Sequence, residues 1–363
     1  FFKEEGWEEF LNLACTLSSE KGNTYFVFDR GGVAKLSECC RLSFELTPED
    51  LDEAKHPWKM RYCALQNVTL NLPRAAYRAA GDDELLFDII DEEMELAAKA
   101  HLQKRAFIKS ILDLGEKGPL AALCVSHDDE PYLRMRKASH LIGILGLNEM
   151  VQAMTGCQLH ESEEAATLGR AVIQYMDLKC QQLSERLGLK IVLEQTPAES
   201  TALRFAKLDL RAYPDVAKKY VKGDMASGEI YYTNSTHLNY RLAQDPIDKV
   251  MREGELHPMI KAGAITHVWM GEHKPDPKAL ASFVIKTFRH SENAQVAFSP
   301  EFTICNECSH MERGLRDHCE LCGSEDVDGI TRVTGYFTRT SSWNAGKRGE
   351  LKDRARTPVG AAK

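Results

Sequence analysis

The sequence lacks the features that would direct it to a membrane or out of the cell. No apolar run approaches the roughly 20 residues that a transmembrane helix requires. The opening stretch, FFKEEGWEEFLNLACTLSSEKG, is acidic and amphipathic, with neither the basic end nor the apolar core of a signal peptide. An initiator Met is also missing, so we expect that residue 1 is not the natural start. These absences predict a cytoplasmic protein that does not associate with membranes.

The sequence also lacks an excess of positive charge. It has 46 Lys and Arg against 54 Asp and Glu, a formal net charge of −8, which argues against a general nucleic-acid binder. No internal repeat and no long low-complexity linker is present. Hydrophobic residues make up 43% and charged residues 28% of the chain, the balance of a globular protein.

Helical and strand-like patterns alternate along the chain, which predicts an α/β fold. Apolar residues at helical spacing predict helices at 3–20, 83–113, 161–186 and 276–290. Segments rich in β-branched and aromatic residues predict strands at 23–29 and 61–72, a strand or turn leading into a helix within 135–157, and shorter strands within 190–200, 229–236 and 264–272. The composition changes near residue 300, where the chain becomes rich in Cys, Gly and charge before a basic tail whose end we expect to be mobile.

Eleven cysteines are many for a cytosolic protein, but their odd number without a secretory signal does not suggest a disulfide framework. Four of them form two CxxC motifs with ten residues between: Cys305, Cys308, Cys319 and Cys322. Zn²⁺ prefers four tetrahedral ligands, and such a set leaves no open position for chemistry. The spacing predicts one structural zinc, and the alternative is four unrelated buried thiols.

Thirteen positions after Cys322 stands Gly335, in the strand-like stretch ITRVTGYFTRT (330–340). A glycine there can mark a bulge or a close backbone approach. Paired CxxC motifs, then RVTGYF (332–337), then a short basic C-terminus resemble the glycyl radical enzymes, and most closely anaerobic (class III) ribonucleotide reductase. Five more segments are similar to that family and follow its order over nearly the whole chain: NVTLNLPRAAYRA (67–79), LIGILGLNEMVQAMTG (141–156), TPAESTALRFAKLD (196–209), YYTNSTHL (231–238) and ITHVWMGE (265–272).

The resemblance implies that Gly335 carries a backbone radical. A radical at Cα is delocalised onto the flanking amide nitrogen and carbonyl when the centre is planar, and glycine has no side chain to crowd that form. The family has Cys before this glycine and here stands Thr334, which we expect to be tolerated because the chemistry belongs to the glycine. Oxygen cleaves such a radical, so the resemblance implies anaerobic operation. A separate activase that uses S-adenosylmethionine and an iron–sulfur cluster would generate it.

In this family the glycyl radical draws a hydrogen from a cysteine, and the resulting thiyl radical takes the 3′-hydrogen of the ribose. The family's thiyl cysteine lies on a finger loop, which here holds SECCRLSF (37–44). A Cys followed by Arg favours Cys40, and Cys39 remains the alternative. Two inert buried thiols are the other interpretation.

Two further residues are candidates for the active site by resemblance. Cys63, 23 residues after Cys40, is similar in place to a substrate-reducing cysteine, although a plain core cysteine is a fair alternative. Asn67 lies four residues on, so regular alternation of a strand would put both side chains on one face. It would hydrogen-bond the ribose hydroxyls or only satisfy local backbone.

The segment TPAES resembles the family's substrate-phosphate loop, where hydroxyls and backbone N–H groups meet phosphates at a helix N-terminus. The alternative is an ordinary N-cap with a capping-box Glu199. The residues concerned are Thr196, Pro197, Ala198, Glu199 and Ser200.

The family fold is a ten-stranded α/β barrel built from two five-stranded halves. The resemblance implies that this chain holds the second half-barrel with its finger loop (1–300, finger loop 30–46), a four-cysteine zinc clip (301–328), and the glycyl radical loop with the C-terminal tail (329–363). The first half-barrel and the nucleotide-effector region are not expected in it, so we expect a fragment of a longer polypeptide or a chain that another chain completes.

The implied function is anaerobic reduction of ribonucleoside triphosphates to deoxyribonucleotides. The implied partners are the activase, a thioredoxin-like protein or formate as reductant, and a second copy in a homodimer formed through the missing N-terminal part. Two alternatives remain, a lyase-type glycyl radical enzyme and a non-catalytic zinc-ribbon binding protein.

Overall fold

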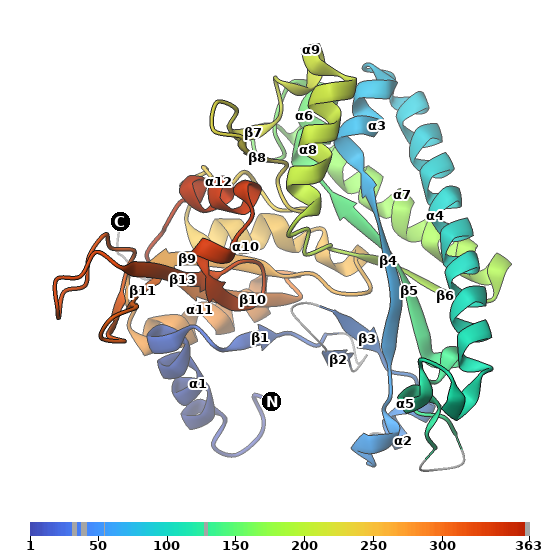
Figure 1. Ribbon diagram of the computed structural model, residues 1–363, viewed down its shortest axis with the longest axis horizontal. Coiled ribbons are helices and arrows are strands. Elements are labelled where there is room, and N and C mark those ends of the chain that lie inside the picture. Colours follow the sequence, from blue (N-terminus) through green and yellow to red (C-terminus); the bar gives the residue numbers. More distant parts are fainter. Residues whose placement is uncertain (31–34, 38–41, 54, 127–129, 360–363) are drawn as a thin grey trace.

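A computed structural model describes residues 1–30, 35–37, 42–53, 55–126 and 130–359. The two finger-loop cysteines, Cys39 and Cys40, lie outside these described residues. Strands and helices alternate along most of the chain, so the expected mixed α/β class is confirmed. Figure 1 places the long helix α4 at one edge of the molecule and the C-terminal strands β11 and β13 at the opposite edge.

The first sheet is parallel and has the order β4-β5-β6. Its strands are β4 (Cys63–Asn71), β5 (Ala138–Leu145) and β6 (Lys190–Glu194). One face is covered by α3 (Leu72–Ala79), α4 (Asp83–Leu112), α6 (Leu147–Thr155) and α7 (Glu163–Leu187), and this layer holds the largest hydrophobic core. The alternate strand residues Ile142, Ile144 and Leu193 belong to that core, and the other face carries polar groups beside a smaller apolar cluster that includes Leu141.

The second sheet has the order β1-β10-β9. Strand β10 (Gln295–Pro300) runs parallel to β9 (Thr266–Gly271) and antiparallel to β1 (Tyr25–Val27). Helices α1 (Trp7–Lys21), α10 (Pro246–Gly254) and α11 (Pro277–His290) supply the core on one face, where Val268, Val296 and Phe298 are buried. The other face carries Tyr25 and Trp269 by the strand alternation.

Two backbone hydrogen bonds join the sheets through the segment that precedes β9. The N–H of Ala262 donates to the carbonyl of Leu193 at 3.0 Å, and the N–H of Gln195 donates to the carbonyl of Gly263 at 3.3 Å. The side chain of Gln195 adds two bonds, donating to Thr236 Oγ1 at 3.0 Å and accepting from the N–H of Ile265 at 2.9 Å. These bonds connect the carboxyl end of β6 to the segment that leads into β9.

The C-terminal part forms a third, antiparallel sheet of order β12-β11-β13-β14. Its strands are β11 (Phe302–Cys305), β12 (Met311–Arg313), β13 (Val327–Arg332) and β14 (Phe337–Arg339). Helix α12 (Ala345–Asp353) follows in the basic tail, where we had expected no helix.

The remaining elements are short. Strands β2 (Lys35–Ser37) and β3 (Ser43–Glu45) pair in the finger-loop region, and β7 (Lys222–Asp224) pairs with β8 (Glu229–Tyr231). The other helices are α2 (Pro48–Glu53), α5 (Ala121–Cys124), α8 (Thr201–Ala212) and α9 (Pro214–Ala217). Five 3₁₀ turns complete the described chain: Pro57–Lys59, Gly115–Lys117, Met135–Lys137, His257–Met259 and Thr340–Ser342.

Most elements expected from the sequence are present near their expected bounds. The helix predicted at 83–113 is α4, capped by Asp82, whose side chain accepts from the N–H of Leu85 at 3.1 Å. The helix predicted at 161–186 is α7, which ends at Gly188 in the left-handed region. Among the described residues, no helix is both long and apolar enough to span a bilayer.

Candidate active site

The predicted radical glycine lies in a buried hairpin loop. Arg332 of β13 pairs with Phe337 of β14, which leaves residues 333–336 as a four-residue connection that we call the glycine loop. The N–H of Val333 closes the loop by donating to the carbonyl of Tyr336 at 3.1 Å. Hairpin loops usually face solvent, yet Gly335 is buried. Gly335 therefore faces the protein interior, while its neighbour Tyr336 is exposed.

Two donors, one buried and one partly buried, meet at the Gly335 carbonyl. The Arg332 guanidinium and the Tyr25 hydroxyl both donate to this oxygen, and Arg332 also donates to the Tyr25 oxygen at 2.5 Å. The guanidinium lies over the rings of Tyr25 and Phe337, 4.4 and 4.6 Å from their centroids. Strands β1 and β13, about 300 residues apart in sequence, thus converge on the glycine.

A second arginine, the residue that follows α12, holds the start of the glycine loop. Arg354 donates to the carbonyl of Arg332 at 2.9 Å and to that of Val333 at 3.2 Å. Its guanidinium lies 3.8 Å from the Trp269 ring centroid and pairs with Glu350 at 2.7 Å. Burial alone would raise the pKa of Glu350, but Lys347 and Arg354 outweigh it and lower that pKa. Glu350 therefore stays charged and keeps Arg354 in place.

The glycine loop contacts the segment that we predicted to bind phosphates. The Glu199 carboxylate accepts from Thr334 Oγ1 at 3.3 Å and from the Tyr336 hydroxyl at 3.2 Å. The Glu199 carbonyl accepts from Asn344 Nδ2 at 2.8 Å. Helix α8 begins after Ser200, which makes no side-chain capping bond, so the alternative of a capping-box Glu199 is not what the structure shows.

The loop at 196–200 is also held on its other side. Ala198 has a φ of 50°, a strained conformation for a residue with a Cβ. Asn234 Nδ2 donates to the carbonyl of Pro197 at 2.7 Å, which brings in the TNST segment predicted to belong to the family pattern. That segment is fixed in turn by Glu149, which accepts from Thr233 Oγ1 at 2.6 Å.

A row of polar side chains crosses the first sheet beside these loops. Asn67 donates to Glu194, Thr69 Oγ1 donates to Asn67 Oδ1 at 3.3 Å, and Thr69 meets Thr196 Oγ1 at 3.2 Å. A Cβ at Gly143 of β5 would lie 1.9 Å from Thr196 Oγ1 and 2.6 Å from Asn67 Oδ1. Only glycine at this position lets β4 and the Thr196 hydroxyl approach across β5.

The expected position of Cys63 relative to Asn67 is wrong. Cys63 pairs with Ala138 and Asn67 pairs with Leu141, and the register shifts between Ala64 and Gln66. Because these partners lie three residues apart on β5, the alternation of β5 puts Cys63 and Asn67 on opposite sides of the sheet. A one-residue bulge has removed the geometric argument for Cys63, and its chemical role stays a prediction.

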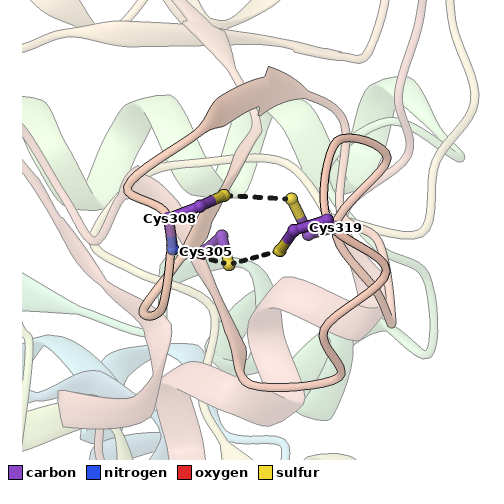
Figure 2. A group of neighbouring side chains, drawn as sticks. Cys305, Cys308 and Cys319 are labelled. Carbon is purple, nitrogen blue, oxygen red and sulfur yellow. Dashed lines mark hydrogen bonds between the residues drawn. The ribbon is translucent and has the colours of Figure 1, made fainter.

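The four predicted metal ligands converge. The sulfur atoms of Cys305, Cys308, Cys319 and Cys322 all lie within 4.8 Å of one another (Figure 2). The closest pairs, Cys305 with Cys322 and Cys308 with Cys319, are 3.6 Å apart. Each CxxC turn is followed by a residue in the left-handed region, Ser309 at a φ of 60° and Gly323 at 74°. The two turns are thus similar knuckles that face each other.

The fold and these sites together define an α/β protein that combines a cluster of four cysteines able to hold a metal with a glycine loop that contacts residues 196–200. The family model for anaerobic ribonucleoside-triphosphate reductase matches residues 1–356, so the chain belongs to that family. The resemblance noted in the sequence is confirmed.

Curated relatives agree with this assignment. The anaerobic ribonucleoside-triphosphate reductase of Salmonella typhimurium is 27% identical over 311 residues, covering 80% of this chain and 42% of the relative. That of Enterobacteria phage T4 is 27% identical over 308 residues, covering 80% of this chain and 48% of the relative. This chain therefore spans less than half the length of these relatives.

Solved structures share the fold at lower identity. An anaerobic ribonucleotide reductase gives a TM-score of 0.73 at 18% identity, covering 97% of this chain and 52% of its own. The Thermotoga maritima enzyme with MES in the active site gives 0.72 at 19% identity, covering 93% and 52%.

Several residues of the site were not found by sequence reasoning. Arg332 stands inside the RVTGYF motif itself, so its place next to the glycine was a usable signal. Tyr25, Gly143, Glu194 and Arg354 gave no such signal, because each comes from a segment that meets the site only in the folded chain.

Proposed function

We propose that this protein serves as part of an anaerobic enzyme that reduces ribonucleoside triphosphates to deoxyribonucleoside triphosphates by glycyl and thiyl radical chemistry. The observation that carries the proposal is the buried Gly335, which lies on a loop bonded through Glu199 to the predicted phosphate loop. A backbone radical must be kept from water and close to substrate, and this placement meets both needs. Family membership supports a reductase over a lyase-type glycyl radical enzyme or a zinc-ribbon binding protein.

The proposed architecture is the second half of a ten-stranded barrel. Five strands follow in the order β4, β5, β6, β9 and β10, with backbone bonds bridging β6 to the segment before β9. The polar faces of both sheets then line the barrel interior, together with the glycine loop. In this scheme residues 1–300 form the half-barrel, 301–328 the zinc clip and 329–363 the radical loop and tail.

In the proposed mechanism Gly335 stores the radical and Cys40, with Cys39 as the alternative, passes it to the substrate. Asn67 is oriented by Glu194 and Thr69, so its remaining hydrogen-bonding capacity is available to ribose hydroxyls. The loop at 196–200 takes the phosphates through its hydroxyls and N–H groups. Cys63 keeps its predicted role, a reducing thiol that a thioredoxin-like protein would regenerate by exchange, on the resemblance alone, because its strand position is on the side of the sheet opposite Asn67; with formate as reductant it would be a core residue.

We propose that the four cysteines hold one structural Zn²⁺. The 3.6 Å separations match the edges of a tetrahedron with metal–sulfur distances of about 2.3 Å. With four thiolates the ion would fix the two knuckles and through them β11 and β13, which lead to the glycine loop. Its contribution is to shape and not to chemistry.

The proposed partners follow from the same scheme. An activase with S-adenosylmethionine and an iron–sulfur cluster would generate the radical, and a second copy of the complete polypeptide would form the dimer. The proposed location is the cytoplasm.

The test uses the complete polypeptide with its activase under anaerobic conditions. Activated protein is expected to show a glycyl radical doublet by electron paramagnetic resonance, to reduce a ribonucleoside triphosphate, and to be cleaved at residue 335 on exposure to air. Gly335→Ala is expected to abolish all three. Gly188→Ala is the control for the loss of a glycine elsewhere, because a Cβ there meets no atom within 4 Å and the strain at its φ of 62° is confined to the end of α7. A radical that persists in Gly335→Ala would refute the proposal.

A further inference from the structure

The hydrogen-bond donors around the Gly335 carbonyl oxygen are more than burial of the residue requires. A carbonyl in a four-residue hairpin turn is ordinarily satisfied by water or by one backbone N–H. Here it accepts from a guanidinium and from a phenol, and both donors are themselves held. Arg332 is 1% exposed, and it also donates to the carbonyl of Gly22.

From this geometry we infer that Arg332 and Tyr25 are positioning residues that hold the Gly335 carbonyl oxygen and stabilise the radical on its Cα. The inference rests on the proposed function. When the Cα–H bond of Gly335 breaks, the hydrogen atom leaves with the abstracting radical and the unpaired electron stays on Cα. The carbonyl is the electron-accepting side of the delocalised system, and donors at its oxygen favour the form in which that oxygen carries negative charge.

The arrangement also fixes the plane of the carbonyl. The guanidinium lies between the rings of Tyr25 and Phe337, which limits its rotation. The Tyr25 hydroxyl receives one hydrogen bond from Arg332 and gives its own hydrogen to the Gly335 oxygen, so the two donors cannot move independently. Delocalisation needs the Cα substituents and the carbonyl in one plane, and two linked donors on one oxygen hold that plane before the radical forms.

The first test observes the carbonyl without any radical. Gly335 and Tyr336 form the only Gly-Tyr pair in the sequence, so ¹³C-carbonyl glycine combined with ¹⁵N-tyrosine gives one carbon–nitrogen correlation from this chain. Tyr336→Phe assigns that signal in the complete polypeptide, because it removes the labelled nitrogen. Tyr25→Phe and Arg332→Lys are expected to move the carbonyl signal upfield. Tyr175→Phe is a control that leaves it in place, because the Tyr175 hydroxyl donates to Asp91 at 2.7 Å.

The second test measures the radical after activation to completion. Tyr25→Phe is expected to lower the radical content about threefold and Arg332→Lys about tenfold, as for the loss of a neutral and of a charged hydrogen bond. In both variants the g values and the α-hydrogen splitting are expected to change, which looser packing of the loop alone would not produce. Tyr175→Phe is the control here too, because its hydroxyl donates to Asp91 and takes no part in the glycine loop, and it is expected to leave the spectrum unchanged.

The outcomes separate this inference from the proposed function. An unmoved carbonyl signal, or a radical with wild-type content and spectrum in both variants, overturns the inference and leaves the proposed function standing. A wild-type protein that forms no radical with a competent activase refutes the proposed function and the inference with it, even where the carbonyl signal moves. A shifted signal with a weaker, altered radical supports both.

Discussion

Replacing Arg354 with Met is expected to loosen the glycine loop while leaving the half-barrel intact. The Arg354 side chain is fully buried, and its removal takes a donor from the carbonyls of Arg332 and Val333. It also leaves the buried Glu350 carboxylate with Lys347 as its remaining partner, at 2.6 Å. Breaking a buried ion pair costs about 3–5 kcal/mol, and we expect the lower end because Lys347 still compensates the charge.

Hydrogen exchange at the Val333 amide measures this effect, because that N–H closes the glycine loop. A loss of about 3 kcal/mol in local stability corresponds to exchange faster by about a hundredfold or more. The pKa of Glu350 is lowered in the folded protein, so its ion pairs stabilise above the ordinary carboxyl pKa and are lost as the pH falls. The difference between variant and wild type should therefore shrink below about pH 4.3.

Lys352→Met is the matched control in the last turn of α12. Lys352 pairs with Glu229 at 2.6 Å, but its side chain is 70% exposed, and surface pairs contribute about 0–1 kcal/mol. Exchange at Val333 in this variant should stay close to wild type. Equal exchange rates in the Arg354 and Lys352 variants would refute the argument that Arg354 holds the loop.

The remaining predictions concern the metal, the substrate face and acid stability. Purified protein should contain about one zinc per chain. The Cys319→Ser variant should lose the zinc, and the backbone amides of β11 and β13 should then lose their protection from hydrogen exchange. Full protection without metal would contradict this. Cys63→Ser, activated to wild-type radical content, should lose turnover with a thioredoxin-type reductant. Unchanged turnover would show that Cys63 is a core residue without a chemical role. Asn67→Ala should lower kcat/KM about tenfold at unchanged radical content, and an unchanged value would remove Asn67 from the site. Burial opposes ionisation of Glu253, but Lys249 and His237 lower its pKa to about 2. The ionised carboxylate therefore stabilises the folded protein above about pH 4.3, and this contribution decreases as the pH falls towards 2. Glu253→Gln should flatten that part of the plot of unfolding free energy against pH, and a wild-type slope would contradict the assignment.

The sequence predicted those parts of the fold whose signals are local. Helix α4 was found to within a residue at each end, because its apolar spacing and its Asp82 cap are both encoded within the helix. The four cysteines were found because their spacing alone defines two knuckles. Gly335 was singled out because the CxxC motifs and RVTGYF together resemble the family, and its role as the radical residue stays a prediction.

The parts that escaped prediction depend on distant contacts. Arg354 belongs to a basic tail that suggests exposure, and only the folded chain shows that Trp269 and Glu350 bury it. The bulge between Ala64 and Gln66 leaves no mark in a continuous strand-like segment, yet it reverses the side on which Cys63 lies. Whether Gly335 faces Cys40, as the mechanism requires, stays a prediction because Cys40 lies outside the described residues.

Glu199 is shared by two loops, and this has a consequence for the order of events. Its carboxylate bonds the glycine loop, while its backbone belongs to the segment proposed to hold phosphates. In the proposed mechanism an activase would reach Gly335 only after the glycine loop leaves its buried position, which would break both carboxylate contacts. If bound phosphates order residues 196–200, they strengthen those contacts, and by thermodynamic reciprocity an opened loop weakens phosphate binding by the same factor. Substrate would then slow the loading of the radical and, once it is loaded, keep it enclosed.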